Sequence, residues 1–146
     1  MSTSVYTART NYVKVADMSA LVNTLTNTGI LIEPARETST EKGKHCLLAP
    51  NGFATVTFDG GTEEADGIDF DAELHVMPYI EVGEVLVIQE VGNESMRWVC
   101  GYANAYLRVE DGSVKNWVIS LDDIYEQAAL AFQNERINLP ITEASY

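Results

Sequence analysis

The stretch V-L-V-I-Q-E-V, residues 85–91, is the first of three β-rich segments that decide the fold. Residues 96–109 and 114–120 follow it and are also rich in aromatic and β-branched side chains. The connections, residues 92–95 (G-N-E-S) and 110–113 (E-D-G-S), have the composition of short turns. Together these segments predict an antiparallel meander of three strands.

The middle strand of this meander is apolar on both of its faces. One face carries Met96, Trp98, Cys100, Tyr102 and Tyr106, and the other carries Val99, Ala103, Ala105, Leu107 and Val109. Because both faces carry several apolar or aromatic side chains, we expect both to be covered for much of the strand. Gly101 predicts a bend or a bulge within it.

Working outward to the start of the chain, we predict a strand, a helix and a second strand. Residues 10–15 (T-N-Y-V-K-V) alternate as a strand does. Asp17 is a candidate N-cap for a helix whose apolar residues recur at helical spacing, and Gly29 is placed to end it. Residues 30–33 (I-L-I-E) form the next strand, so a right-handed parallel crossover can connect the two.

A loop and a hairpin are expected next. Residues 35–44 are polar and predict the loop. The β-rich runs 46–49 and 53–58 flank Pro50-Asn51-Gly52, and an Asn-Gly pair between two such runs favours a tight turn. This arrangement predicts a β-hairpin.

Residues 68–80 fit either a strand or a helix. A strand would place Asp69, Asp71 and Glu73 on one face, where their charges repel one another. A helix would place the acids near its start, where the helix dipole favours them, and Pro78 near its end. We therefore favour the helix.

The last predicted element is a helix over residues 121–134. Ser120 and Asp123 resemble a capping box. An apolar stripe follows, made of Leu121, Ile124, Tyr125, Ala128 and Phe132. The expected architecture is one acidic α+β domain over residues 1–146. It is mainly an antiparallel sheet with a three-strand meander, an N-terminal strand-helix-strand unit and a C-terminal helix.

The charge of the chain is concentrated in its middle third. Nine Lys and Arg against 22 Asp and Glu give a net charge of -13. Residues 45–96 contain no Lys or Arg and eleven of the acids. This balance disfavours direct binding to nucleic acid or to an anionic membrane and favours a basic protein partner. The candidate partner-binding residues are Asp59, Glu63, Glu64, Asp66, Asp69, Asp71 and Glu73.

No motif in the chain assigns a catalytic residue, a metal site or a cofactor. Cys46 and Cys100 are single and far apart, so we interpret both as small core residues. The two histidines, His45 and His75, leave few combinations for acid-base chemistry or metal binding. Glycine-rich phosphate-binding and nucleophile motifs are absent.

Two segments resemble small acidic proteins of phages and mobile elements, a largely uncharacterised group. They are R-T-N-Y-V-K-V, residues 9–15, followed by the Asp-capped helix, and E-V-G-N-E-S-M-R-W-V-C-G-Y-A, residues 90–103. The resemblance implies the order strand, helix, strands, acidic helix, meander and last helix. It also implies a setting in which acidic inhibitors of restriction or CRISPR systems recur, and it transfers no functional residue.

The leading hypothesis is a non-enzymatic, cytoplasmic binding protein whose acidic residues occupy a basic, nucleic-acid-binding surface of a host defence protein. Such DNA mimicry requires carboxylates at a density comparable to that of phosphates. One alternative is an enzyme or metal-binding protein that uses Asp66, Asp69, Glu73 and His75. The other is a self-assembling structural module with Trp98, Tyr102 and Tyr106 at its interface.

Overall fold

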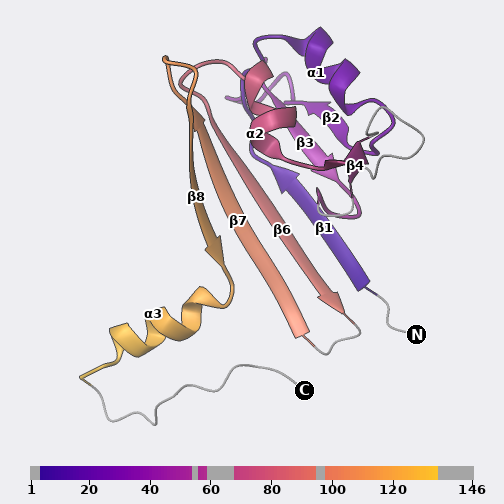
Figure 1. Cartoon of the computed structure of the whole chain (residues 1–146). Coiled ribbons are helices and arrows are strands. Elements are labelled where there is room, and N and C mark those ends of the chain that lie inside the picture. Colours follow the sequence, from indigo (N-terminus) through magenta and orange to yellow (C-terminus); the bar gives the residue numbers. More distant parts are fainter. Residues whose placement is uncertain (1–3, 54–55, 59–67, 95–97, 135–146) are drawn as a thin grey trace.

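The computed structural model describes residues 4–53, 56–58, 68–94 and 98–134. Within them, a six-stranded antiparallel sheet has the order β2-β3-β1-β6-β7-β8, and β4 and β5 form a separate pair (Figure 1). The strands are β1 Ser4–Thr10, β2 Leu31–Pro34, β3 His45–Ala49, β4 Thr57–Phe58, β5 Ile68–Asp69, β6 Val85–Glu94, β7 Trp98–Arg108 and β8 Val114–Ser120. The helices are α1 Met18–Leu25, α2 Ala72–His75, the 3-10 helix η2 Met77–Tyr79, and α3 Asp123–Ala131. The fold class is therefore α+β, as predicted.

The meander is confirmed as β6, β7 and β8. Its register is continuous from the pair Val85↔Leu107 to the pair Val91↔Gly101 and beyond. Gly101 therefore forms no bulge, which was one of the two predicted alternatives. It allows a close approach instead, since a Cβ atom there would lie 2.9 Å from Leu121 Cδ1.

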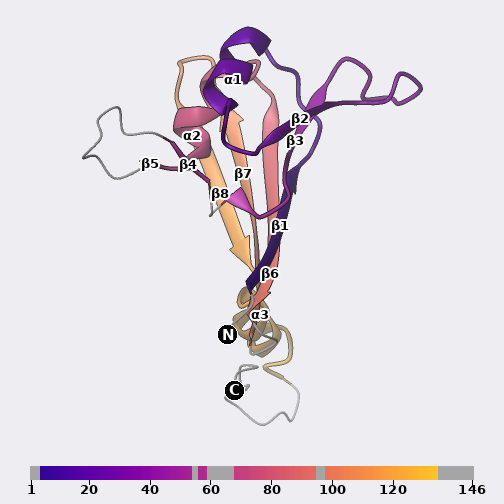
Figure 2. The same cartoon turned by 90° about the vertical axis from the view of Figure 1, so that its right-hand side faces the viewer.

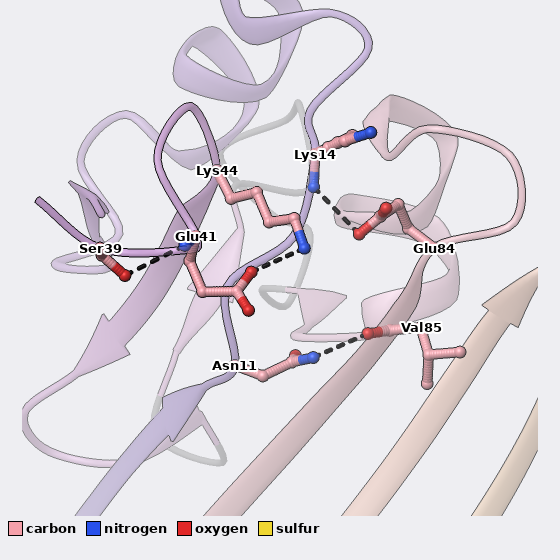
Figure 3. A network of polar contacts seen from close by, with 7 residues as sticks. All are labelled: Asn11, Lys14, Ser39, Glu41, Lys44, Glu84 and Val85. Atoms are coloured by element: carbon pink, nitrogen blue, oxygen red, sulfur yellow. Dashed lines mark hydrogen bonds and ion pairs between the residues drawn. The ribbon is translucent and has the colours of Figure 1, made fainter. Parts of the chain in front are cut away.

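The first strand lies earlier than predicted. It ends at Thr10, and only isolated bridges at Val13 and Val15 remain from the predicted strand over residues 10–15. Asn11 explains the change, because its side chain donates to Val85 O at 2.9 Å (Figure 3). The same side chain accepts from Val87 N at 2.8 Å. The amide side chain thus binds backbone groups of β6 that would otherwise pair with the backbone of a longer β1.

The strand-helix-strand unit is present, with β3 inserted between its two strands. Because β1 and β2 each pair antiparallel with β3, they run parallel to each other. The cap of α1 is also as predicted, since Asp17 Oδ1 accepts from Ala20 N at 3.0 Å.

The predicted hairpin around residues 50–52 does not form. A turn does occur there, with Gly52 N donating to Ala49 O at 2.9 Å and Gly52 at a φ of 83°. However, β3 pairs with β2 and β1, and β4 pairs with β5. Phe53 leaves the turn to enter the core, where it is 1% exposed. Burial of this large side chain redirects the chain away from β3.

The ambiguous segment is divided between the two predicted structures. Ile68–Asp69 is a strand, and a short helix begins at Ala72 after Asp71, which caps it. Pro78 does not follow the end of this segment. It lies at the start of η2. A proline is favourable there, because the backbone N–H that it lacks would have no acceptor within the helix.

The two faces of the sheet differ. Figure 2 shows the sheet edge-on, with α2 and the β4–β5 pair on one side of the meander. The inner face of β6 carries Leu86, Ile88 and Glu90, all buried, and packs with residues of α1, α2 and η2. The outer face of the meander is defined by Val85, Val87, Gln89, Val91, Gly101, Ala103, Ala105, Leu107, Lys115, Trp117 and Ile119. The exposed side chains among them belong to β6 and β8, whereas Ala103, Ala105 and Leu107 of the middle strand are half-buried. The predicted cover of the middle strand is therefore present only in part on this face.

The C-terminal helix is confirmed with shorter limits than predicted. Its start has the predicted contact, since Ser120 N donates to Asp123 Oδ2 at 2.6 Å. Its apolar stripe, however, is not buried, and α3 extends from the end of β8 away from the covered part of the sheet (Figure 1).

Candidate functional site

Three of the seven predicted partner-binding acids lie in the described part of the chain, on β5 and at α2. These are Asp69, Asp71 and Glu73. The remaining four, Asp59, Glu63, Glu64 and Asp66, lie outside the described residues. The structure thus brings Asp69, Asp71 and Glu73 to one short segment that packs beside the meander.

Asp71 and His75 hold the start and end of α2 together. Asp71 Oδ1 accepts from Glu73 N at 2.9 Å, and Asp71 N donates to His75 Nδ1 at 2.9 Å. The imidazole also stacks on Phe58, with ring centroids 3.8 Å apart. His75 is therefore engaged through both its ring face and one nitrogen, which gives it a structural role.

Glu73 ties α2 to the edge of the meander. Its Oε1 accepts from Asn116 Nδ2 at 2.9 Å. Asp69 is exposed on β5. Asp69 and Asp71 lie beside the β7 residues Tyr102, Asn104 and Tyr106.

Three cations of the described ranges, Lys42, Lys44 and Arg108, bind groups away from these acids. The two ion pairs there, Lys42 with Glu37 and Lys44 with Glu41, both lie in the loop after β2, and Figure 3 shows the second. The bond to Glu41 raises the pKa of Lys44. Arg108 donates to the backbone oxygens of Pro78 and Ile80. Within residues 68–94, no carboxylate forms an ion pair with a described cation.

A groove of about 470 Å³ separates β5 and α2 from the inner face of β6 and β7. We call it the acidic groove. It is lined by Ile68, Asp69, Phe70, Asp71, Ala72, Leu74, Ile88, Tyr102, Asn104 and Tyr106. One wall carries two carboxylates, and the other carries two phenol rings and an amide.

The β7 wall of the groove is polar but short of donors. Asn104 Nδ2 donates to the Tyr106 hydroxyl at 2.8 Å, while Asn104 Oδ1 is buried and accepts no hydrogen bond from the described residues. The Tyr102 hydroxyl donates to Glu90 Oε2 at 2.6 Å. The groove therefore presents mainly acceptors and ring faces.

Burial and nearby carboxylates raise the pKa of both tyrosines of the groove. Burial raises the pKa of Tyr106, and the charges of Asp71 and Glu73 raise it further. Burial also raises the pKa of Tyr102, as does its hydrogen bond to Glu90. Both effects disfavour loss of the phenol proton, because a phenolate would add another negative charge to the groove.

The residues of the two alternative hypotheses are arranged differently from what the sequence suggested. In the described part of the chain no three His, Cys, Asp or Glu side chains are grouped so as to hold a metal ion. Cys46 is buried as expected, whereas Cys100 is exposed, which corrects the interpretation of both as core residues. Tyr102 and Tyr106 lie on the inner face, where Tyr102 is exposed and Tyr106 is half-buried.

Sequence reasoning missed Trp117, whose side chain is 75% exposed on the outer face. Its strand, V-K-N-W-V-I-S, is apolar at consecutive positions 117–119 and does not alternate. The sequence offers no signal for its position, because the register that pairs Trp117 with Ala105 and places it on the face opposite Tyr106 is seen only in the structure.

Comparisons with protein families, with curated proteins and with solved structures find no match to this chain. No helix in the described ranges is long and apolar enough to cross a bilayer.

Proposed function

We propose that this chain is a non-enzymatic binding protein that engages a basic surface of another protein through the acidic groove. The observation that carries the proposal is the pair of groove carboxylates, Asp69 and Asp71, which have no ion-pair partner among the described residues. A carboxylate without a local cation keeps its full attraction for an external one.

The groove suits the side chain of lysine or arginine. Carboxylate oxygens accept charge-assisted hydrogen bonds from either cation, and a guanidinium adds bidentate geometry. The rings of Tyr102 and Tyr106 offer faces to which a cation is attracted. Asn104 Oδ1 adds an acceptor that still lacks a donor. A neutral or anionic ligand would use few of these groups.

The proposal extends to DNA mimicry. The seven acids of residues 59–73 give the segment a high density of negative charge, and a surface that binds DNA is built from lysines and arginines facing phosphates. Such a surface on a host defence protein would be blocked by this chain. A phage or mobile-element origin, suggested by the sequence resemblance, is the setting in which an anti-restriction or anti-CRISPR inhibitor acts.

A defined cationic peptide tests the acidic groove. We expect an oligo-arginine peptide to bind in isothermal titration calorimetry with an affinity that falls as salt rises, because the attraction is screened. Asp69→Lys should weaken binding about tenfold, since it replaces an attraction inside the groove by a repulsion of at least ~1.4 kcal/mol.

The matched control is Glu110→Lys, which makes the same charge change at the exposed turn between β7 and β8. Equal losses in both variants would mean that net charge alone drives binding, and the groove would have no role.

Mimicry is tested separately: a host protein retained by this chain should be released by double-stranded DNA, and retention despite excess DNA would exclude a shared surface.

A further inference from the structure

The outer face of the meander is an apolar surface that no element of the described chain covers. Exposed fractions reach 75% for Trp117, 53% for Val91, 49% for Ile119 and 43% for Val85. Trp117 alone leaves roughly 150 Å² in water, and monomeric proteins rarely expose a contiguous apolar patch of more than a few hundred Å². A surface of this kind is typical of an interface.

The charge of this face points to a second copy of the chain as its occupant. The net charge of -13 opposes self-association over most of the molecule. The outer face carries no carboxylate; Lys115 is its single charged residue, and the adjoining β1 adds Arg9 on the same side of the sheet. A basic partner would find no anion to pair with here, and nucleic acid would find two cations. Two copies can approach through this face without bringing acids together.

The shape of the face supplies a matching hollow. A cavity of about 540 Å³ lies between β3, β1 and β6 and is lined in part by Arg9, Gln89 and Val91. Ile119 lies at the same level of the sheet, because Ile119 pairs with Ala103, Ala103 with Gln89, and Gln89 with Arg9. The hollow and the exposed isoleucine are thus on one row across the strands.

The strand order makes this row self-complementary. In the sequence of strands β1-β6-β7-β8, β1 and β8 lie at equal distances from the line between β6 and β7, because strand spacing is even. A two-fold axis along that line, between two facing sheets, places β8 of one copy over β1 of the other. Ile119 of each copy then lies over the hollow of its partner, as in an isologous dimer.

We propose that the outer face of the meander binds the outer face of a second copy, with Ile119 of each copy seated in the hollow beside Arg9 and Gln89 of the other. Stable interfaces bury about 800 Å² on each partner, and the exposed side chains of the outer face provide much of that area. The proposal is independent of the acidic groove, which lies on the opposite face.

Sedimentation of the full chain tests the proposal. We expect a particle of twice the 16.1 kDa chain mass that dissociates on dilution. Ile119→Asp should raise the dissociation constant at least tenfold while circular dichroism shows an unchanged fold. Val118→Asp is the matched control, because Val118 is exposed on the same strand but pairs with Asn104 on the inner face. It should leave the dimer intact.

A cysteine pair tests the geometry. Arg9→Cys combined with Ile119→Cys, in a Cys100→Ser background, should form a dimer linked by disulfides under oxidation, because the two-fold axis places β8 of one copy over β1 of the other. Within one chain the two positions are three strands apart, about 14 Å, which exceeds the reach of a disulfide. The same pair with Val118→Cys in place of Ile119→Cys should not cross-link.

Three results would overturn the proposal. A monomeric wild-type chain would mean that another segment or another protein covers the face. A dimer that tolerates Ile119→Asp would place the interface elsewhere. Equal disruption by Ile119→Asp and Val118→Asp would indicate pairing through the free edge of β8 instead.

Discussion

Glu90 lies in the acid-rich stretch but is part of the protein interior. It belongs to the eleven acids of residues 45–96, yet it is 3% exposed. Its Oε2 accepts from the Tyr102 hydroxyl and from Phe53 N, so the buried carboxylate is supported by two donors. A buried charge is tolerated when such hydrogen bonds replace water. Position in the sequence alone does not separate this acid from the surface acids.

We expect Tyr102→Phe to lower the free energy of unfolding by about 1–2 kcal/mol, because it removes a hydrogen bond to a charged group. The partial exposure of Tyr102, 38%, keeps the loss below that of a fully buried bond. Urea unfolding at neutral pH measures it. Tyr12→Phe is the control, since no hydrogen bond to the Tyr12 hydroxyl occurs among the described residues.

The same variant has a signature in its pH dependence. The pKa of Tyr102 is raised above its ordinary 10.0 by burial and by Glu90, so the folded state favours the protonated phenol. The stabilising contribution is complete below pH 10.0 and is lost as the pH rises above that value. The difference between wild type and Tyr102→Phe should therefore shrink in alkali. A constant difference would exclude this linkage.

At the scale of elements, similar amphipathic patterns led to different outcomes. The helix α1 buries Leu21 and Leu25, whereas α3 buries no residue. Both helices were predicted from their spacing of apolar residues. Periodicity predicts which residues of a helix share a face, but a second element is needed to cover that face. A nine-residue helix such as α3 is marginal in water by itself.

Helix caps provide an element-scale prediction. Asp17→Ala should destabilise the protein by about 1 kcal/mol, because Asp17 Oδ1 satisfies a free backbone donor of α1. Asp122→Ala at the start of α3 is the matched control. Asp122 makes no capping bond with its side chain, so its loss should stay within about 0.5 kcal/mol. Thermal unfolding compares the two variants, and equal decreases in melting temperature would show that the Asp17 cap does not stabilise the protein.

At the scale of the whole molecule, the uneven charge affects stability. Eleven acids in residues 45–96 repel one another without a Lys or Arg in that segment. Added sodium chloride should therefore raise the free energy of unfolding by about 1 kcal/mol between low and moderate salt, because the repulsion is screened.

Urea unfolding at a fixed protein concentration measures this effect, since dimerisation also changes apparent stability. Asp69→Asn should reduce the salt dependence by removing one of the repelling charges. A stability that falls with salt would instead mean that attractive charge pairs dominate the fold.

The sequence by itself determined the meander, the Asp17 cap, the C-terminal helix and the location of the acids. These depend on side chains a few residues apart, which interact whatever the rest of the chain does. Only the tertiary structure decided that Phe53 enters the core in place of a hairpin, that Asn11 ends β1, and that one face of the meander stays open. The first two outcomes depend on contacts between residues 37 and 74 positions apart in the chain, and the third on the fact that no other described segment packs against that face. The strength of such contacts is set by what packs against the segments and not by local pattern.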